Sequence, residues 1–250
     1  MKLNLSIFIF LFVLCAFTLP EKRRIKIFLA GDSTMALKEK KAYPETGWGM
    51  PFVHFWDSTL TVVNKAKNGR STKTFISEGL WQSIIDKLQD GDYVFIQFGH
   101  NDEAKEKVER YASPEEYKTN LTKFINEVRS KKASPVLLTP VSRRRFKEGK
   151  QVETHQVYSQ LVTELAASLH VPFFDLDLAS RNLYQQMGEE NSKLLFLQLK
   201  PGEHPNYPEG KNDNTHFNEL GARLIAQMVL QWIKENDPVL SEYIVKPLKK

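Results

Sequence analysis

The segment IKIFLAGDS, from Ile25 to Ser33, decides the fold because it joins a short apolar run to a polar turn. An apolar run of this length that stops at a glycine is typical of a strand buried inside a sheet. We expect the strand to occupy Ile25–Ala30 and to end at Gly31, which leaves Ser33 in the loop beyond it. Comparable runs predict four more strands, at Leu60–Asn64, Tyr93–Phe98, Pro135–Thr139 and Pro172–Phe174.

Segments with apolar residues at helical spacing alternate with these strands. We predict helices at Thr74–Leu88, Pro114–Ser130, Val152–Leu169 and Asn218–Glu235. Alternation of this kind implies a parallel sheet with helices on both faces. The predicted fold is therefore α/β, a three-layer α/β/α sandwich around a five-stranded parallel sheet in the flavodoxin-like order 2-1-3-4-5. That order places the first and third strands side by side, so the loops with Ser33 and Asn101 share one edge.

The N-terminus has the pattern of a targeting segment. Lys2 precedes the apolar run Leu5–Phe17, and the small residue Thr18 closes an Ala-Phe-Thr sequence suited to cleavage. We predict a signal peptide at residues 1–18 and a single domain at residues 19–250. Export to the periplasm or the cell exterior follows, without stable insertion in the membrane after cleavage. An uncleaved membrane anchor is the alternative, although the run is short for a span.

Cysteine content and charge narrow the class of protein further. Cys15 is the only cysteine, and a lipoprotein anchor there is a second alternative that the bulky Leu14 fits poorly. Cleavage would leave a chain without disulfides, cysteine nucleophiles or thiolate metal ligands. The formal charge of +5 favours an anionic partner. Basic residues alternate with acidic ones along the helices, so we expect no nucleic acid partner, and we expect a monomer.

Three residues in two distant motifs have the chemistry of a catalytic triad. Ser33 follows the first strand in Gly-Asp-Ser, while Asp213 and His216 lie three positions apart before the last helix. A nucleophilic serine needs an imidazole base, and that base needs a carboxylate to orient it. Each residue also has a plain structural explanation: Ser33 as a helix cap, Asp213 in a turn, and His216 as a surface histidine.

Two further loops could supply hydrogen-bond donors to a developing oxyanion. Asn101 follows the third strand and offers a side-chain amide, and Gly69 follows the second strand and offers a backbone N–H. With the backbone N–H of Ser33 they would form an oxyanion hole. The Asn68-Gly69 pair is equally consistent with an ordinary turn. We expect His100 to be a packing residue rather than the base, because it has no carboxylate at similar spacing.

In combination, Ser33, Gly69, Asn101, Asp213 and His216 resemble the motif residues of the SGNH (GDSL-type) hydrolases. Longer strings resemble the rhamnogalacturonan acetylesterases in particular. They are Gly31-Asp32-Ser33-Thr34-Met35, Thr46-Gly47-Trp48-Gly49, Asn68-Gly69-Arg70-Ser71-Thr72, Phe98-Gly99-His100-Asn101-Asp102, Thr139-Pro140-Val141-Ser142-Arg143-Arg144 and Tyr207–Phe217. The resemblance implies a serine esterase that removes acetyl groups from a pectic polysaccharide through an acetyl-serine intermediate, without cofactor or metal.

Substrate-binding residues are predicted on weaker grounds. Arg143, Arg144 and Arg145 follow the fourth strand and could bind galacturonate carboxylates, or could simply form a basic loop with internal salt bridges. Trp48 could stack on a sugar, although a tryptophan between glycines is equally often a packing anchor.

Other functions remain open at this point. The same fold could hydrolyse lipid esters, thioesters or xylan acetyl groups, because fold does not determine substrate. A carbohydrate-binding protein without catalysis is another reading. A metallohydrolase would need ligands from His100, Asp102, His204, Asp213 and His216, among which there is no closely spaced His-x-x-x-His pair.

Overall fold

The structure is a computed structural model that describes residues 24–246, so the predicted signal peptide lies outside the described residues. A five-stranded parallel sheet forms its centre. The strands are β1 (Ile25–Gly31), β2 (Leu60–Asn64), β3 (Tyr93–Gln97), β4 (Ser134–Leu138) and β7 (Phe173–Phe174), in the order β2-β1-β3-β4-β7. The predicted sheet and its 2-1-3-4-5 order are confirmed.

Strand register brings two of the predicted site loops together. Gly31 at the end of β1 is paired with Gln97 at the end of β3. Because the two strands are parallel, the chain leaves both at the same edge of the sheet. Ser33 and Asn101 therefore lie in neighbouring loops.

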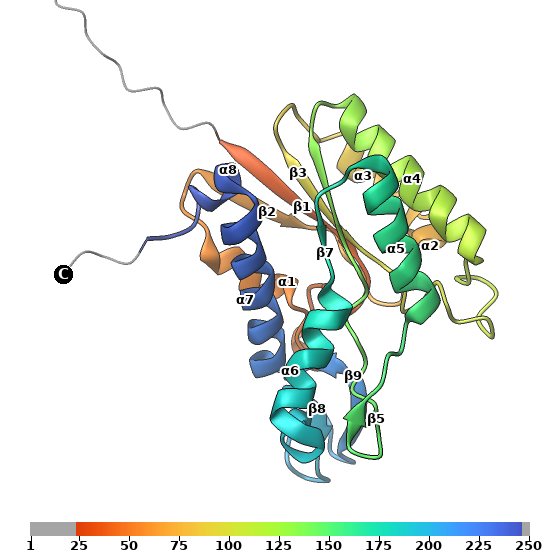
Figure 1. The fold of residues 1–250 in the computed structure, drawn as a ribbon. Helices are drawn as coiled ribbons and strands as arrows, with labels where there is room; N and C mark the ends of the chain where they lie inside the picture. The colour runs from red at the N-terminus through yellow and green to blue at the C-terminus, as the bar shows by residue number, and fades with distance from the viewer. Residues whose placement is uncertain (1–23, 247–250) are drawn as a thin grey trace, which may run out of the picture.

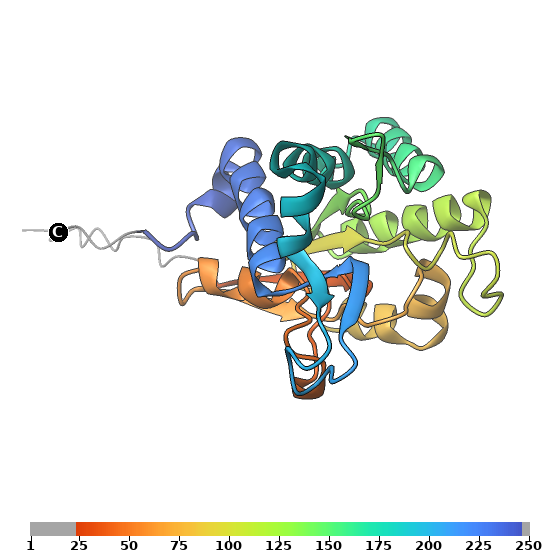
Figure 2. The same ribbon diagram turned by 90° about the horizontal axis from the view of Figure 1, so that it is seen from below.

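Helices cover both faces of the sheet (Figures 1 and 2). One face holds α1 (Gly49–Phe52), α6 (Leu176–Asn191), α7 (Glu219–Asn236) and α8 (Pro238–Ser241), and the other holds α2 (Thr72–Ser77), α3 (Leu80–Ile85), α4 (Pro114–Ser130) and α5 (Gln156–Leu169). Alternate residues of β1 face opposite layers: Ile27 and Leu29 pack in one apolar cluster, Phe28 and Ala30 in the other. Strand β1 thus contributes side chains to the hydrophobic core on both faces of the sheet.

Several helix boundaries differ from prediction. The helix expected at Thr74–Leu88 is two helices, because Gly79 adopts a left-handed conformation with φ of 71° between them. The helix expected from Val152 begins only at Gln156, since residues before it form a small hairpin of β5 (Phe146–Lys147) and β6 (Lys150–Gln151). Helix α6 was not predicted. Within the described residues, three 3₁₀ turns complete the helical elements, at Lys40–Ala42, Val53–Phe55 and Ser192–Leu195.

A second hairpin, separate from the main sheet, carries the remaining site residues. It pairs β8 (Phe196–Leu199) with β9 (Lys211–Phe217) in antiparallel fashion and lies at the lower end of the molecule in Figure 1. Asp213 and His216 belong to β9, a strand that the sequence analysis did not predict. Helix α7 follows immediately, and its first turn is capped by Asn218, whose Oδ1 accepts from the Gly221 N–H at 3.0 Å.

Candidate active site

The turn after β1 presents Ser33 at the edge of the sheet. Asp32 is fully buried, and its Oδ1 accepts from the backbone N–H and the hydroxyl of Thr34 at 2.9 and 2.8 Å. A Cβ at Gly31 would lie 2.7 Å from the Gln97 carbonyl oxygen, so only glycine lets β1 and β3 run this close. These contacts fix the turn beneath Ser33, which is 8% exposed.

Ser33, His216 and Asp213 form one chain of hydrogen-bonding groups. The Ser33 Oγ lies 2.9 Å from Nε2 of His216, and Nδ1 of the same ring lies 2.8 Å from Oδ2 of Asp213. The other carboxylate oxygen, Oδ1, accepts from the backbone N–H groups of Thr215 at 2.7 Å and His216 at 2.9 Å. The hairpin thus holds the acid rigidly against the ring, and the ring against the serine.

Asp213 is ionised in this arrangement. Partial burial raises the pKa of Asp213, but the hydrogen bonds from the His216 ring and from two backbone N–H groups outweigh it and hold the pKa well below its ordinary value of 3.8. An anionic Oδ2 accepts a hydrogen bond from the Nδ1–H of His216, which leaves Nε2 as the acceptor for the Ser33 hydroxyl. The ring is therefore held in the tautomer that a general base requires.

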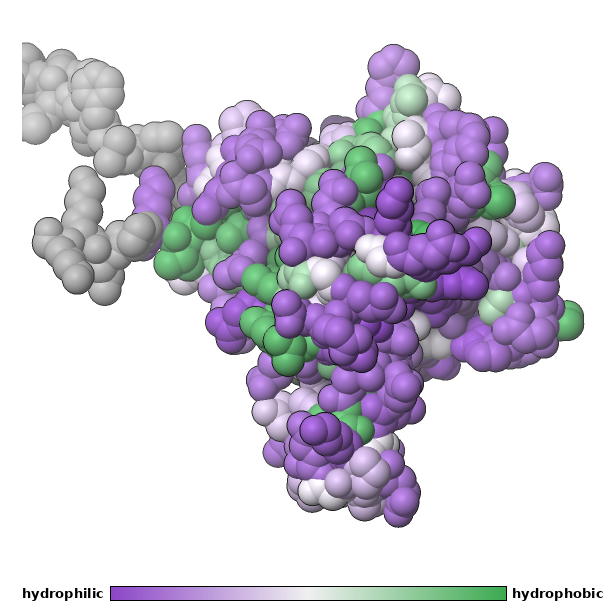
Figure 3. Space-filling view, turned by 60° about the horizontal axis from the view of Figure 1, so that its bottom comes forward, coloured by the Kyte–Doolittle hydropathy of each residue, from purple (hydrophilic) through white to green (hydrophobic). Residues whose placement is uncertain are grey.

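The hydroxyl opens into a cleft of about 540 Å³. Gly69, Asn101 and Arg143 lie on its wall together with the residues of the triad. Within residues 24–246 the backbone N–H groups of Ser33 and Gly69 have no acceptor, so both are available to a ligand. Charged side chains of both signs surround the opening, and the face of the molecule in Figure 3 is largely hydrophilic, with hydrophobic residues in separate small areas.

Buried polar residues support the Asn101 loop from behind. Oδ1 of Asp102 accepts from the N–H and hydroxyl of Thr72 at 2.8 and 2.6 Å, which ties the loop to the start of α2. Burial raises the pKa of Asp102 to about 7. His100 is buried against the ring of His155, with centroids 4.2 Å apart, and burial lowers its pKa well below the ordinary value. A neutral, buried ring agrees with the predicted packing role.

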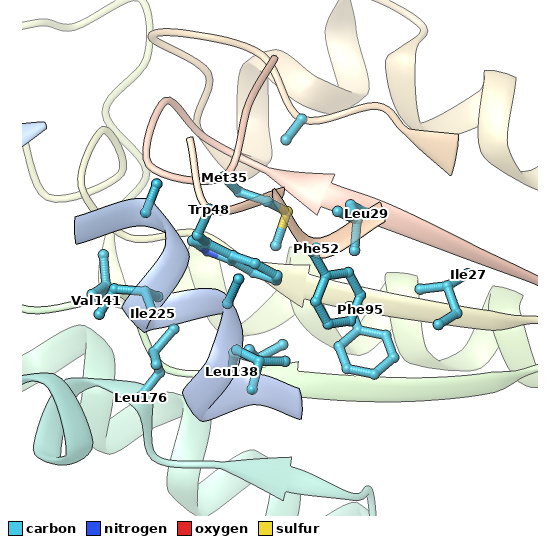
Figure 4. Packing of buried hydrophobic residues seen from close by; sticks show 14 of the residues in the cluster. Ile27, Leu29, Met35, Trp48, Phe52, Phe95, Leu138, Val141, Leu176 and Ile225 are labelled. Atoms are coloured by element: carbon cyan, nitrogen blue, oxygen red, sulfur yellow. The ribbon is translucent and has the colours of Figure 1, made fainter. Parts of the chain in front are cut away.

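Two predicted substrate contacts are wrong. Trp48 is fully buried among Met35, Phe52 and other core residues, as Figure 4 shows, and its Nε1 donates to Gln97 at 2.7 Å, so no sugar can stack on it. Arg144 is 8% exposed, and its guanidinium donates to Ser192, Asn214 and the Glu189 carbonyl. It fastens β9 to the end of α6 rather than reaching substrate.

Arg143 makes contacts inside the protein and also lines the cleft. Its guanidinium donates to Glu103 at 3.1 Å and to the Thr215 hydroxyl at 2.9 Å, and Glu103 also contacts Nδ1 of the buried His155. These contacts join the Asn101 loop to strand β9. Arg143 still lines the cleft, with 32% of its side chain exposed, so a substrate contact stays a prediction for this residue. Arg145 is exposed and lies outside the cleft wall.

Sequence reasoning missed Arg110, which donates to Oδ1 of Asn101 at 3.0 Å. It lies in the irregular segment between Asp102 and α4, where no periodicity or motif draws attention to it. Arg110 is nine residues from Asn101 in the sequence, and only the three-dimensional course of the intervening loop shows that their side chains are in contact.

Comparison with known proteins agrees with this geometry. Residues 29–224 match the GDSL-like lipase/acylhydrolase family, which is more than half of the chain. The chain therefore belongs to this family and is a carboxylic ester hydrolase.

Two relatives come from Bacillus subtilis (strain 168). Rhamnogalacturonan acetylesterase RhgT is 41% identical over 225 residues, covering 90% of this chain and 96% of that protein. Probable rhamnogalacturonan acetylesterase YesY is 36% identical over 221 residues, covering 88% and 97%. The crystal structure of B. subtilis YxiM superimposes with a TM-score of 0.74 at 26% identity, over 86% of this chain and 57% of that one.

Between residues 24 and 246, no three His, Cys, Asp or Glu side chains gather in a way that could hold a metal ion. In the same range, no helix combines the length and apolar character needed to cross a bilayer.

Proposed function

We propose that this protein is a serine esterase that removes O-acetyl groups from pectic rhamnogalacturonan, with Ser33 as nucleophile, His216 as base and Asp213 as the orienting acid. The observation that carries the proposal is the 2.9 Å contact between Ser33 Oγ and an imidazole already fixed by an ionised carboxylate. The substrate class is supported by relatives of nearly equal length that are named for this activity.

The first step is acyl transfer to the enzyme. As the Ser33 Oγ attacks the acetyl carbonyl carbon, Nε2 of His216 takes the hydroxyl proton, and the carbonyl oxygen becomes an oxyanion. The N–H groups of Ser33 and Gly69 and the amide of Asn101 donate to it. A single donor of this type contributes on the order of 2.7–4 kcal/mol to transition-state stability.

Collapse of this intermediate completes the acyl transfer, and attack by water then regenerates the enzyme. When the tetrahedral intermediate collapses, the proton on His216 passes to the departing sugar oxygen, which leaves as an alcohol. A water molecule then attacks the acetyl-serine while His216 accepts its proton. The ester bond to Ser33 breaks, the proton on His216 passes to the Ser33 oxygen, and the product departs as acetic acid, which loses its proton to solvent to become acetate.

The character of the cleft supports a carbohydrate rather than a lipid. Its wall includes charged side chains such as Glu45, Glu106 and Arg143, with which the acyl chain of a lipid would make poor contact. Sugar hydroxyls and carboxylates can hydrogen-bond to such a wall. The signal peptide predicted at residues 1–18 supports action outside the cytoplasm, where such polymers are found.

Acetate release by purified protein tests the proposal. The substrates are acetylated rhamnogalacturonan, acetylated xylan, 4-nitrophenyl acetate and a long-chain 4-nitrophenyl ester, and the variants are Ser33→Ala and, as a control, Ser130→Ala at the exposed end of α4. We expect turnover of the acetates, fastest on the pectic polymer, loss of it in Ser33→Ala, and no change in Ser130→Ala. Full activity in Ser33→Ala would exclude the mechanism, and preference for the long chain would exclude the substrate.

A further inference from the structure

One guanidinium nitrogen contacts acceptor oxygens on two of the three residues assigned to the oxyanion hole. Nη1 of Arg110 donates to Oδ1 of Asn101 at 3.0 Å and, over a longer 3.4 Å, to the carbonyl oxygen of Gly69. The packing is close as well, because a Cβ at Gly69 would lie 3.2 Å from the same nitrogen. Arg110 therefore contacts both of the loops that are proposed to donate to the acyl oxygen, and it lines the cleft beside them.

The partners of Asn101 select one orientation of its amide. Oδ1 faces the guanidinium of Arg110, which can only donate, and Nδ2 donates to the carbonyl of Arg70 at 2.9 Å, which can only accept. A flipped amide would oppose donor to donor and acceptor to acceptor. Since Nδ2 carries two hydrogens and Arg70 takes one, the second remains for a ligand in the cleft.

The positive charge of Arg110 also strengthens the Asn101 amide as a hydrogen-bond donor. A guanidinium stays protonated at any working pH, and its hydrogen bond to Oδ1 draws electron density from the amide and strengthens the remaining N–H as a donor. The Asn101 side chain is nearly buried, and the Arg110 side chain is 21% exposed, so solvent screens this interaction only in part. Nε of Arg110 is buried without a hydrogen bond and lies 3.9 Å from a carboxylate oxygen of Glu109.

We propose that Arg110 is a positioning residue of the oxyanion hole, which holds the Asn101 amide with its free N–H toward the acyl oxygen and the Gly69 loop against it. The inference rests on the esterase function proposed above. Because the oxyanion exists only after attack, loss of this positioning lowers kcat and leaves KM nearly unchanged. Arg110 also lines the cleft, and a role in binding a substrate carboxylate would instead raise KM for the acidic polymer alone.

A neutral substrate and a double-mutant cycle separate these roles. Kinetics on 4-nitrophenyl acetate compare wild type, Arg110→Met, Arg110→Lys, Asn101→Ala and the double variant Asn101→Ala/Arg110→Met. The control is Lys105→Met, an equal charge change in the same segment at an exposed position outside the cleft wall. Thermal unfolding of each variant establishes that the fold is retained.

We expect Arg110→Met to lower kcat about 10- to 100-fold, less than complete loss of a donor. Lysine at 110 should restore part of the rate, the control should match wild type, and Arg110→Met should have little further effect once Asn101 is alanine. An unchanged kcat in folded Arg110→Met, or an equal loss in both backgrounds, would overturn the inference. If the wild-type protein did not hydrolyse 4-nitrophenyl acetate, the result would instead exclude the esterase function itself. If Arg110→Met does not fold, the Arg110→Lys cycle with Asn101→Ala gives the same decision.

Discussion

Replacing Asp213 with asparagine reverses the hydrogen bond to Nδ1 of His216 and keeps the backbone contacts of strand β9. Oδ1 of Asp213 accepts from the backbone N–H groups of Thr215 and His216, and only an oxygen can take that place. The asparagine must therefore keep its oxygen there and turn its NH₂ toward Nδ1 of His216, which in wild type lies 2.8 Å from Oδ2. An NH₂ group at this position requires an unprotonated Nδ1.

The magnitude follows from the tautomer that results. With Nδ1 unprotonated, the proton of the neutral ring moves to Nε2, which then faces Ser33 as a donor and cannot accept the hydroxyl proton. The same change in a serine protease triad lowers kcat by about 10⁴. At about 1.36 kcal/mol for each tenfold change, this corresponds to roughly 5.4 kcal/mol of barrier. Both backbone contacts of Asp213 are retained, so we expect little change in thermal stability.

Stopped assays on 4-nitrophenyl acetate, with the thermal unfolding midpoint as a check of folding, measure this effect. Asp86→Asn, an equivalent change at an exposed site after α3, is the control and should match wild type. A folded Asp213→Asn variant that keeps more than about a tenth of wild-type kcat would refute the reasoning, because the acid would then not set the tautomer of His216.

Three other changes give sharp outcomes. Asn101→Ala should lower kcat by about 10²–10³ in a folded protein, and a variant that fails to fold would show the residue to be structural instead. Arg144→Met should lower the free energy of unfolding by about 1–3 kcal/mol in denaturant titrations, because the acceptors on Asn214 and at Glu189 lose a buried donor; an unchanged midpoint would contradict this. Burial raises the pKa of Asp102 from 3.8 to about 7, so native protein holds this proton more tightly than the unfolded chain, and the associated stability is complete below pH 3.8 and lost as pH rises through 7. The stability of Asp102→Asn relative to wild type should therefore increase between pH 5 and pH 8, and an equal difference at both values would show that the carboxyl is not protonated in the native state.

The sheet, and the residues Ser33, Asp213 and His216 that meet at its edge, could be identified because local sequence encodes them. The runs at β1 and β3 are apolar on both faces, which identifies central strands, and the polar motifs stand directly after them. Parallel strand order then brings Ser33 and Asn101 together with no further information. The triad needs only that the chain return to this edge before α7.

Elements with weak apolar patterns were missed for a physical reason. Helix α6 buries polar Asp177 and Ser180 along with Leu176 and Tyr184, so its stripe does not stand out as hydrophobic. Strand β9 has the sequence KNDNTHF, which lacks apolar alternation and pairs through its backbone with β8. A periodic pattern of apolar residues is the signal that predicts a buried helix or strand, and neither α6 nor β9 has such a pattern.

The roles of Trp48, Arg144 and Arg110 depend on tertiary contacts that residue type cannot supply. A tryptophan beside a catalytic loop looks the same in sequence whether it faces solvent or the core. The adjacent residues Arg143 and Arg144 differ in role because Arg144 reaches the end of α6 and Arg143 reaches Glu103. Such assignments follow only from the path of the surrounding loops.

The central claim is that Ser33 carries the acetyl group during turnover. Mixing the protein with 4-nitrophenyl acetate, quenching with acid within the first turnover and mapping the modification by peptide mass spectrometry tests it directly. The account predicts one acetyl group on Ser33 in wild type and an unmodified peptide in Ser33→Ala. An acetyl group at another residue during rapid turnover, or turnover by Ser33→Ala at the wild-type rate, would contradict it.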